Sequence, residues 1–277
     1  MIDLKKVDEL VKKVEASRHQ NLNCDGEKLN AAELKVGVDL GTAYIGIVVL
    51  NADNQPLACE LEAAEVVRDG LVVDYMGAIT IVRRLKEKLE NRLGVELQQA
   101  AIAVPSETSE ADSKTHKHVV EATGMEVLNT LDEPSAANSV LNVKNGAVVD
   151  IGGGTTGISI FENGELVKTA DEATGGTHLT LTIAGNYKID FAEADKLKVD
   201  PAKQADVYSI VLPVLNKIGS IVKDKAAEHQ VEELYLVGGT SCLKGIEKAI
   251  ESETAIKSFK PENPFLVTPL GIALNCL

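Results

Sequence analysis

A short pattern, an aspartate followed by a glycine-rich turn, occurs twice in this chain. Residues 38–41 are Val-Asp-Leu-Gly, and residues 149–152 are Val-Asp-Ile-Gly. The alignment of the two copies continues without a gap, since Gly46 and Ile47 of the first copy align with Gly157 and Ile158 of the second. An internal repeat of this kind indicates a duplicated structural unit. We therefore expect two equivalent halves, each with a strand, an aspartate, a glycine-rich turn and a second strand.

Hydrophobic periodicity divides both halves into strands and helices. Short apolar runs bounded by glycine, proline or asparagine are typical of strands, and apolar residues three and four positions apart are typical of helices. Strands that alternate with helices indicate an α/β protein. The expected strands are residues 36–39, 45–50, 57–61, 100–104, 126–131, 147–151, 157–161, 166–170 and 234–237, and the expected helices are residues 1–17, 74–93, 109–123, a helix opening at Pro134, 176–185, 191–197, 203–228, 243–251 and 270–274.

The two glycine-rich turns have the composition of phosphate-binding loops. Glycine lets backbone N–H groups approach an anion without a Cβ atom in the way, and successive N–H groups form an anion site. Thr42, Thr155 and Thr156 add hydroxyl donors. Asp39 and Asp150 stand at strand ends beside the turns, where carboxylates hold Mg²⁺ through water. The sequence therefore predicts a site for a phosphate group and Mg²⁺.

Two other phosphate-binding motifs are excluded. Residues 152–157, Gly-Gly-Gly-Thr-Thr-Gly, match the glycine spacing of a dinucleotide-binding fingerprint, but that motif requires a helix directly after it. The following residues 158–161, Ile-Ser-Ile-Phe, predict a strand instead. The chain also contains no GxxxxGK[ST] P-loop sequence.

Composition excludes several further classes of function. The net charge of −14 repels nucleic acid, and five Tyr, four Phe and no Trp provide little stacking surface for bases. The four cysteines are far apart in sequence, which excludes a CxxC metal or redox site and indicates reduced thiols. No apolar run approaches the roughly 18 residues of a membrane span, and the N-terminus does not resemble a signal peptide. We expect a cytoplasmic protein that binds neither nucleic acid nor membranes.

Five motifs in a fixed order resemble the actin/Hsp70/sugar-kinase ATPase superfamily across about residues 34–277. The resemblance implies two actin-like (ribonuclease H-like) halves with reduced outer subdomains around a nucleotide cleft that holds ATP and Mg²⁺. It divides the chain into an N-terminal helix and linker (1–33), subdomain I (34–145) and subdomain II (146–277). The motifs are the two phosphate loops at 38–42 and 149–155, a first connecting motif at 133–137, an adenosine motif at 236–240 and a second connecting helix at 268–273.

Three further stretches resemble the ethanolamine-utilisation J family, an Hsp70-like group encoded with bacterial microcompartment enzymes. They are residues 66–70, 77–84 and 171–176. This resemblance implies an ATP-binding chaperone or assembly factor, in the cytoplasm or at the microcompartment, with microcompartment enzymes or shell proteins as partners. The alternatives are an active ATPase that reactivates a partner enzyme and an actin-like scaffold. A small-molecule kinase is disfavoured, because sugar kinases build their acceptor site from larger insertions.

The superfamily resemblance assigns roles to individual residues. It implies that Asp39 and Asp150 face Mg²⁺ and that Glu133 lies near the attacking water, which makes Glu133 and Asp150 the candidate catalytic residues. Asp195 and Lys198 resemble the ribose-contacting pair of the bacterial actins, with Asp in place of Glu. The expected nucleotide-binding residues are Asp39, Gly41, Thr42, Ala43, Tyr44, Gly152, Gly153, Gly154, Thr155, Thr156, Gly175, Gly176, Asp195, Lys198, Gly238, Gly239 and Thr240.

Two departures from the superfamily pattern bear on hydrolysis. Gly157 stands where Hsp70 and actin have a further aspartate. No lysine occurs between Lys35 and Lys86 to match the phosphate-binding lysine of Hsp70, and Arg68 is the nearest cation of interest. Phosphoryl transfer depends on positioning and on charge neutralisation. We therefore expect nucleotide binding with weak or absent ATPase activity.

The first 33 residues have a different character. Leu4, Val7, Val11 and Val14 recur at helical spacing, and residues 18–33 are polar. Microcompartment cargo proteins often carry such a helix and linker, which leads to the hypothesis that this apolar stripe docks on a shell or cargo partner. The alternative is a helix packed on its own domain, or a frayed tail. Deleting residues 1–30 tests the hypothesis, since unchanged recruitment to the compartment would contradict it.

Overall fold

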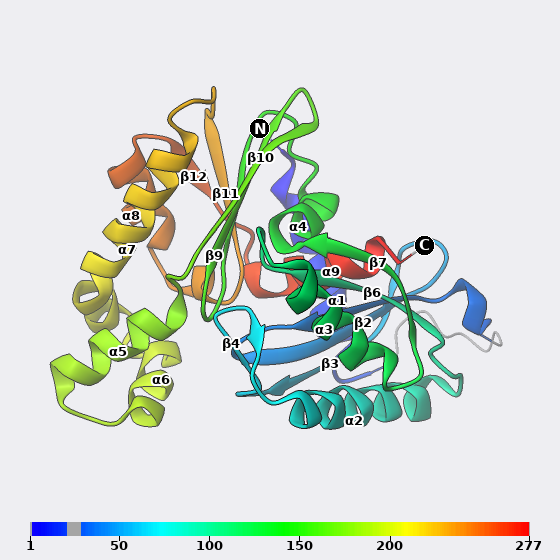
Figure 1. Ribbon diagram of the computed structural model, residues 1–277. Helices are drawn as coiled ribbons and strands as arrows, with labels where there is room; N and C mark the ends of the chain where they lie inside the picture. Colours follow the sequence, from blue (N-terminus) through cyan, green and yellow to red (C-terminus); the bar gives the residue numbers. More distant parts are fainter. Residues whose placement is uncertain (1, 21–28, 277) are drawn as a thin grey trace. The chain divides into compact units, whose positions relative to one another are not determined.

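The chain forms two compact units, each built around a sheet of five strands. The computed structural model describes residues 2–20 and 29–276 (Figure 1). The terminal unit comprises Ile2–Asn142 together with Leu266–Leu277, and the central unit comprises Val143–Phe265. The expected boundary lies between residues 145 and 146, whereas the two units divide between Asn142 and Val143. The end of the chain, however, belongs with the first half and not with the second, and part of the expected polar linker, residues 21–28, lies outside the described residues.

The terminal unit contains a sheet with the strand order β3-β2-β1-β6-β7. The first three strands are antiparallel neighbours, whereas β6 and β7 run parallel to β1. A separate small hairpin of β4 and β5 was not expected from the sequence. The strands are β1 (Lys35–Leu40), β2 (Tyr44–Leu50), β3 (Pro56–Ala63), β4 (Val67–Arg68), β5 (Leu71–Val72), β6 (Gln99–Val104) and β7 (Glu126–Asp132).

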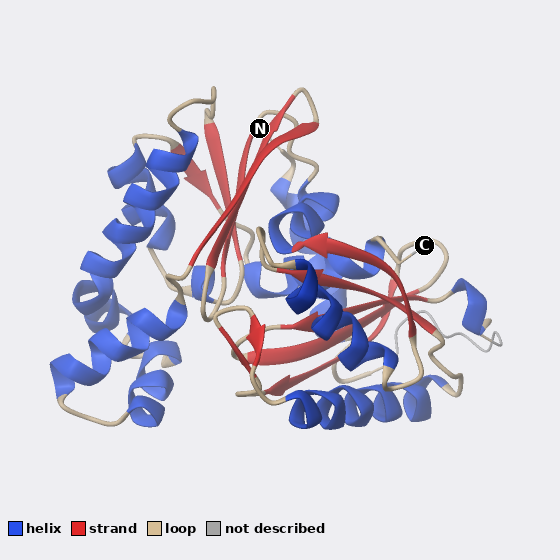
Figure 2. Ribbon diagram, in the orientation of Figure 1, coloured by secondary structure: helices blue, strands red, loops and turns tan. Residues whose placement is uncertain are grey.

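Helices cover both faces of this sheet (Figure 2). α2 (Tyr75–Leu93) and α3 (Glu110–Glu121) enclose the main aliphatic core on one face. On the other face lie α4 (Glu133–Leu141) and α9 (Val267–Leu274). A Cβ atom on Gly37 would overlap the backbone of Ala273, and one on Gly271 would overlap the carbonyl of Ala136. α9 therefore lies directly on β1 and α4, which is why the end of the chain belongs to the terminal unit.

The N-terminal helix α1 (Leu4–Ala16) also packs on the terminal unit. Its side chains Val7, Val11 and Val14 are buried, mainly against β3. Beyond the helix, the guanidinium of Arg92 donates to the carbonyl of Ser17 at 2.7 Å. The hypothesis that this apolar stripe docks on a partner is therefore wrong for these three valines. The alternative of a helix packed on its own domain is confirmed.

The central unit repeats the topology of the terminal unit. Its sheet has the order β10-β9-β8-β11-β12, in which β8, β9 and β10 are antiparallel neighbours and β11 and β12 run parallel to β8. This equivalence confirms the expected duplication. The elements are β8 (Gly146–Ile151), β9 (Thr156–Glu162), β10 (Glu165–Glu172), α5 (Gly176–Tyr187), α6 (Phe191–Val199), α7 (Gln204–Ala226), β11 (Glu233–Val237), α8 (Ile246–Thr254) and β12 (Lys257–Phe259).

The long helix α7 bears on the expectation that the chain has no membrane span. By length and composition alone it could cross a membrane, and no other helix in the described part of the chain meets that test. Its apolar residues are interrupted by polar ones such as Asn216 and Lys217. In the structure Val207, Val211 and Leu215 of α7 are buried in the core that the helix shares with α5, α8 and β9.

Candidate functional site

The second glycine-rich turn, the expected phosphate loop, is anchored to the start of α5 through its carbonyl groups. The loop connects β8 to β9, so that a strand follows it and not a helix. The N–H of Gly176 donates to the carbonyl oxygen of Gly152 at 3.0 Å. The N–H of Thr177 donates to the carbonyl oxygen of Gly153 at 2.7 Å. Two successive carbonyl groups of the loop therefore face α5.

This anchoring decides where the N–H groups of the loop point. The described residues contain no cis peptide bond, and in a trans peptide the carbonyl oxygen and the next N–H lie on opposite sides. Because the carbonyls of Gly152 and Gly153 face α5, the N–H groups of Gly153 and Gly154 point away from it. Successive N–H groups directed to one side form an anion-binding concavity. The turn thus has the backbone geometry of a phosphate loop.

Two glycines at the start of α5 permit this close approach. A Cβ atom on Gly175 would lie 2.8 Å from the carbonyl oxygen of Gly152 and 3.0 Å from that of Gly153. A Cβ atom on Gly176 would lie 2.6 Å from the hydroxyl oxygen of Thr240. A larger residue at either position would push the loop or its neighbour aside. Gly175 and Gly176 therefore contribute to the candidate site because their lack of a side chain leaves room for the carbonyls of the turn and for the Thr240 hydroxyl.

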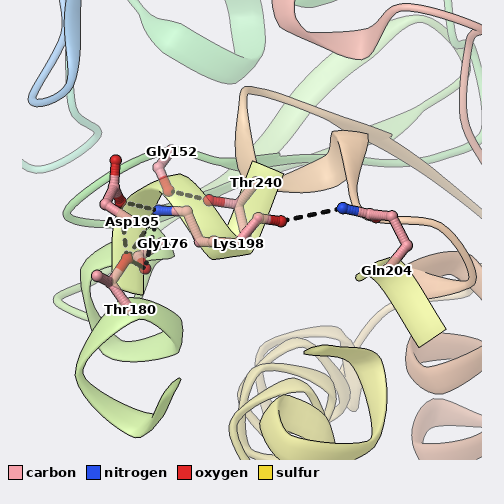
Figure 3. Close-up of polar contacts among 7 residues, drawn as sticks. All are labelled: Gly152, Gly176, Thr180, Asp195, Lys198, Gln204 and Thr240. Carbon is pink, nitrogen blue, oxygen red and sulfur yellow. Dashed lines mark hydrogen bonds and ion pairs between the residues drawn. The ribbon is translucent and has the colours of Figure 1, made fainter. Parts of the chain in front are cut away.

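The turn after β11, which carries the expected adenosine motif, lies beside the phosphate loop. Val237 pairs with Asp150 across the parallel strands β11 and β8, so both strands end at the same edge of the sheet. Gly238 has a φ of +85°, a conformation that favours glycine, and a Cβ atom there would overlap the Asp150 carboxylate. The Thr240 hydroxyl donates to the Gly152 carbonyl at 2.7 Å (Figure 3).

Asp195 and Lys198 of α6 form a network with Thr180 of α5 (Figure 3). Lys198 Nζ donates to Asp195 Oδ1 at 2.6 Å and to Thr180 Oγ1 at 2.8 Å. The Thr180 hydroxyl donates to Asp195 Oδ1 at 2.9 Å. Burial alone would raise the pKa of Asp195, but the hydrogen bond and charge of Lys198 together with the Thr180 hydroxyl lower that pKa overall. The carboxylate is therefore charged at neutral pH.

A pocket of about 220 Å³ opens next to this network. Among the expected residues, Lys198, Gly239 and Thr240 line it. Gln204 joins two of its walls, because its amide nitrogen donates to the Lys198 carbonyl at 3.0 Å and its amide oxygen accepts from the Lys244 N–H at 3.3 Å. A concave, largely apolar pocket with a few polar groups is typical of small-molecule sites. The other lining residues are Leu179, Val199, Pro201, Cys242 and Leu243.

Sequence reasoning missed most of the pocket lining. Leu179, Pro201 and Lys244 come from separate parts of the chain, and only the packing of α5, α6 and α7 against the turn after β11 brings them together. The sequence signals for this pocket were the Gly-Gly-Thr motif at 238–240 and Lys198 of the expected ribose-contacting pair. These signals identify only part of the lining, since the apolar residues of the pocket have the same types as ordinary core residues.

Thr155 and Thr156 are buried in the central unit, where the Thr156 hydroxyl donates to the Thr174 carbonyl at 2.6 Å. The other expected residues belong to the terminal unit, where they lie at one edge of its sheet. β1, β6 and β7 are parallel, so Asp39 near the end of β1 and Glu133 directly after β7 are both at the carboxyl edge. A Cβ atom on Gly41 would lie 2.8 Å from the Tyr44 carbonyl oxygen, which shows how tight the first glycine turn is. Arg68 is exposed on the β4–β5 hairpin. In the first turn Gly41 and Thr42 are half-buried, whereas Ala43 and Tyr44 are exposed.

The carboxylates fit a magnesium ion held chiefly by phosphate and water. The described residues contain no cluster of three or more His, Cys, Asp or Glu side chains that could hold a metal ion by themselves. Mg²⁺ in proteins is usually bound by one or two carboxylates, with phosphate oxygens and waters as the other ligands. Asp150, which is 4% exposed at the end of β8, is a carboxylate of that kind. Gly157, which pairs with Asp150 from the neighbouring strand β9, adds no second carboxylate.

Comparisons with known proteins define the class to which this fold belongs. The family profile of the MreB/Mbl protein matches residues 58–192, and that of cell division protein FtsA matches residues 147–271. The crystal structure of MreB5 of Spiroplasma citri bound to ADP aligns with a TM-score of 0.70 at 15% identity, over 88% of this chain and 96% of that chain. Together with the duplicated sheets and their glycine-rich turns, these matches show an actin-like ATPase fold.

Two relatives are much more similar. The chain is 40% identical over 241 residues to the ethanolamine utilization protein EutJ of Escherichia coli (strain K12), which covers 87% of this chain and 85% of that protein. The crystal structure of EutJ from Carboxydothermus hydrogenoformans aligns with a TM-score of 0.90 at 42% identity over 98% of both chains. The chain belongs to the EutJ family of ethanolamine utilization proteins, which confirms the resemblance predicted from its motifs.

Proposed function

We propose that this protein binds ATP with Mg²⁺ and acts as an Hsp70-like chaperone or assembly factor for ethanolamine utilization enzymes. The observation that carries the nucleotide part is the anchored glycine turn beside the pocket. The N–H groups of Gly153 and Gly154 provide an anion site, and the neighbouring pocket has apolar walls suited to a base. The EutJ relatives support the ethanolamine context, and the order of the five motifs supports the likeness to Hsp70.

In this proposal the residues of the site have separate tasks. The N–H groups of Gly153 and Gly154 bind phosphate oxygens, and Asp195 with Lys198 binds the ribose. Asp150 would hold Mg²⁺ through water, a role that the superfamily resemblance also assigns to Asp39. The ion, when bound, neutralises charge on the phosphate oxygens. Glu133 of the terminal unit orients the attacking water, and microcompartment enzymes or shell proteins are the partners.

We propose further that hydrolysis is weak or absent. Gly157 pairs with Asp150 on one side and with Asp171 on the other, so β9 brings no carboxylate between these strands. Phosphoryl transfer has little covalent chemistry for the protein to perform, so that the loss of one positioned charge has a large effect on its rate. A protein that holds ATP without rapid turnover is suited to a binding role that depends on the nucleotide.

The nucleotide part is tested by calorimetric titration of ATP and ADP, with and without Mg²⁺, and by phosphate release from the same sample. We expect binding that Mg²⁺ strengthens and release close to background. Lys198→Ala should weaken binding, whereas Lys196→Ala, at an exposed position on the same helix, should not. Absence of binding would contradict the proposal. Steady release would contradict weak hydrolysis and favour a reactivating ATPase.

The chaperone part is tested by co-expression with the ethanolamine utilization enzymes of the same organism. We expect a higher soluble yield of at least one enzyme with the wild-type protein than with Lys198→Ala. If the soluble yield is the same with the wild-type protein, with Lys198→Ala and without either protein, the chaperone role is contradicted while nucleotide binding is not affected.

A further inference from the structure

Thr240 is one of the expected nucleotide-binding residues, but its hydroxyl is already engaged inside the protein. Oγ1 donates to the Gly152 carbonyl at 2.7 Å, and the residue is only 8% exposed. The α-carbon of Gly176 lies against the same oxygen, because a Cβ atom there would come within 2.6 Å of it. A hydroxyl has a single proton to donate. The proton of Thr240 is therefore unavailable to a nucleotide while this contact persists.

The Gly152 carbonyl receives two hydrogen bonds from different parts of the central unit. One comes from the Thr240 hydroxyl after β11, and the other comes from the Gly176 N–H at the start of α5, at 3.0 Å. A carbonyl oxygen has two lone pairs, so both are occupied. Together the two donors hold the plane of the peptide between Gly152 and Gly153. Glycine has little conformational preference of its own, so this orientation depends on such contacts.

The orientation of that peptide matters because it aims the Gly153 N–H. With the carbonyl turned toward α5 and Thr240, the N–H on the opposite side of the trans peptide points away from them. Thr240 also lines the pocket, next to Gly239. One residue is thus shared between the wall of the pocket and the anchor of the phosphate loop, and Figure 3 shows its contact with Gly152.

We propose that Thr240 is a positioning residue, which holds the Gly152–Gly153 peptide so that the Gly153 N–H is presented to a phosphate group. The pocket then binds the nucleoside without help from the Thr240 hydroxyl. This inference rests on the proposed nucleotide binding and makes it more specific. It predicts that the hydroxyl contributes to the affinity for a nucleoside phosphate but not to the affinity for the nucleoside alone.

The test compares ADP with adenosine by calorimetry. Thr240→Val removes the hydroxyl at nearly constant volume, and it should lower the affinity for ADP about fivefold, the usual effect of one lost hydrogen bond, while adenosine affinity stays the same. Thr240→Ser keeps the hydroxyl and should retain the affinity for ADP. The matched control is Thr254→Val, because Thr254 is also buried and its hydroxyl donates to a carbonyl, that of Ile250 at 2.8 Å, far along α8.

The outcomes separate the positioning role from simpler roles. Equal losses for ADP and adenosine would overturn the inference, since Thr240 would then act as a wall of the pocket. Unchanged affinity for ADP in Thr240→Val would overturn it as well. If the melting temperature shows that Thr240→Val does not fold, Thr240→Ala provides a second variant without the hydroxyl. Absence of ADP binding by the wild-type protein would overturn the proposed function itself, and this inference with it.

Discussion

At the scale of single residues, the candidate site is built from backbone groups that lie unusually close together. Gly175 lies against the carbonyls of the phosphate loop, and Gly238 lies against the Asp150 carboxylate. The side chain of Thr240 also contacts this loop, at the Gly152 carbonyl. The important property of these glycines is thus the space that they leave, and substitutions that add a single methyl group should be informative.

Gly175→Ala should weaken ADP binding without unfolding the protein. The added Cβ would lie 2.8 to 3.0 Å from three backbone atoms of residues 152–154, so the loop has to shift and its N–H groups lose their direction. We expect a loss of about tenfold in ADP affinity, the size of one or two hydrogen bonds. The control is Gly185→Ala on α5, where nothing lies within 4 Å and alanine favours the helix. Wild-type affinity in Gly175→Ala would contradict this account of the loop.

At the scale of helices and strands, most of the fold was predictable because the local signals agree with the packing. The helix expected from residue 74 is capped by the Asp74 carboxylate, which accepts from the Gly77 N–H at 2.9 Å. The strand β12 was missed, because three residues are too few to show periodicity and its strand form comes from pairing with β11. The burial of α1 was foreseeable from its apolar stripe, but the surface that covers the stripe was not.

The packing of α1 predicts that its valines stabilise the fold. Val11 is 1% exposed, and Val11→Ala would leave a cavity at the contact with β3. We expect a loss of about 2 kcal/mol in the free energy of unfolding, as for other deletions of buried methyl groups. Urea denaturation measures this loss, and Glu9→Ala, at an exposed position on the same helix, serves as the control. An unchanged midpoint for Val11→Ala would reopen the hypothesis of a docking helix.

The helix α3 should make stability depend on pH through His116. Burial lowers the pKa of His116, and its hydrogen bond to the Asp112 carbonyl only partly offsets this effect. Below its usual pKa of 6.5 the unfolded chain therefore binds this proton more readily than the folded chain does, and the free energy of unfolding rises with pH through that range.

We expect the free energy of unfolding to fall between pH 7 and about pH 5.5, the range in which an ordinary histidine becomes protonated. His116→Gln should reduce the part of the fall that comes from this residue. The control is His118→Gln, at an exposed position on the same helix, which should leave the fall in the free energy of unfolding unchanged. If the free energy of unfolding depends on pH equally steeply in the wild type and in His116→Gln, His116 is not the source of the dependence.

At the scale of the whole molecule, the duplicated pattern around Asp39 and Asp150 predicted two equivalent sheets, and both sheets have the same strand order and directions. The pocket was less predictable, because its walls come from elements that are distant in the chain. The final helix was also misassigned. Its sequence resembles a second connecting helix but does not show which sheet it covers, because its place in the terminal unit depends on contacts with β1 and α4 at Gly37 and Gly271.

Removing residues 266–277 should therefore damage the half of the chain that is farthest away in sequence. All residues from Val267 to Ala273 are buried, and they cover β1 and β6. We expect hydrogen exchange of the truncated chain to show strong loss of protection in β1 and β6. Protection in β8 and β11, within the central unit, should be largely retained. The reverse pattern would contradict the observed division of the chain.

The position of α9 also has a consequence for the nascent chain. Residues 2–142 are translated before the central unit, but their sheet lacks the helix that covers β1 until Val267–Leu274 have been made. The central unit is continuous in sequence, so all of its own residues are available before that helix. The terminal unit is thus begun before the central unit and completed after it. A stop codon or frameshift just after Phe265 would leave β1 uncovered although every residue of the central unit had been synthesised.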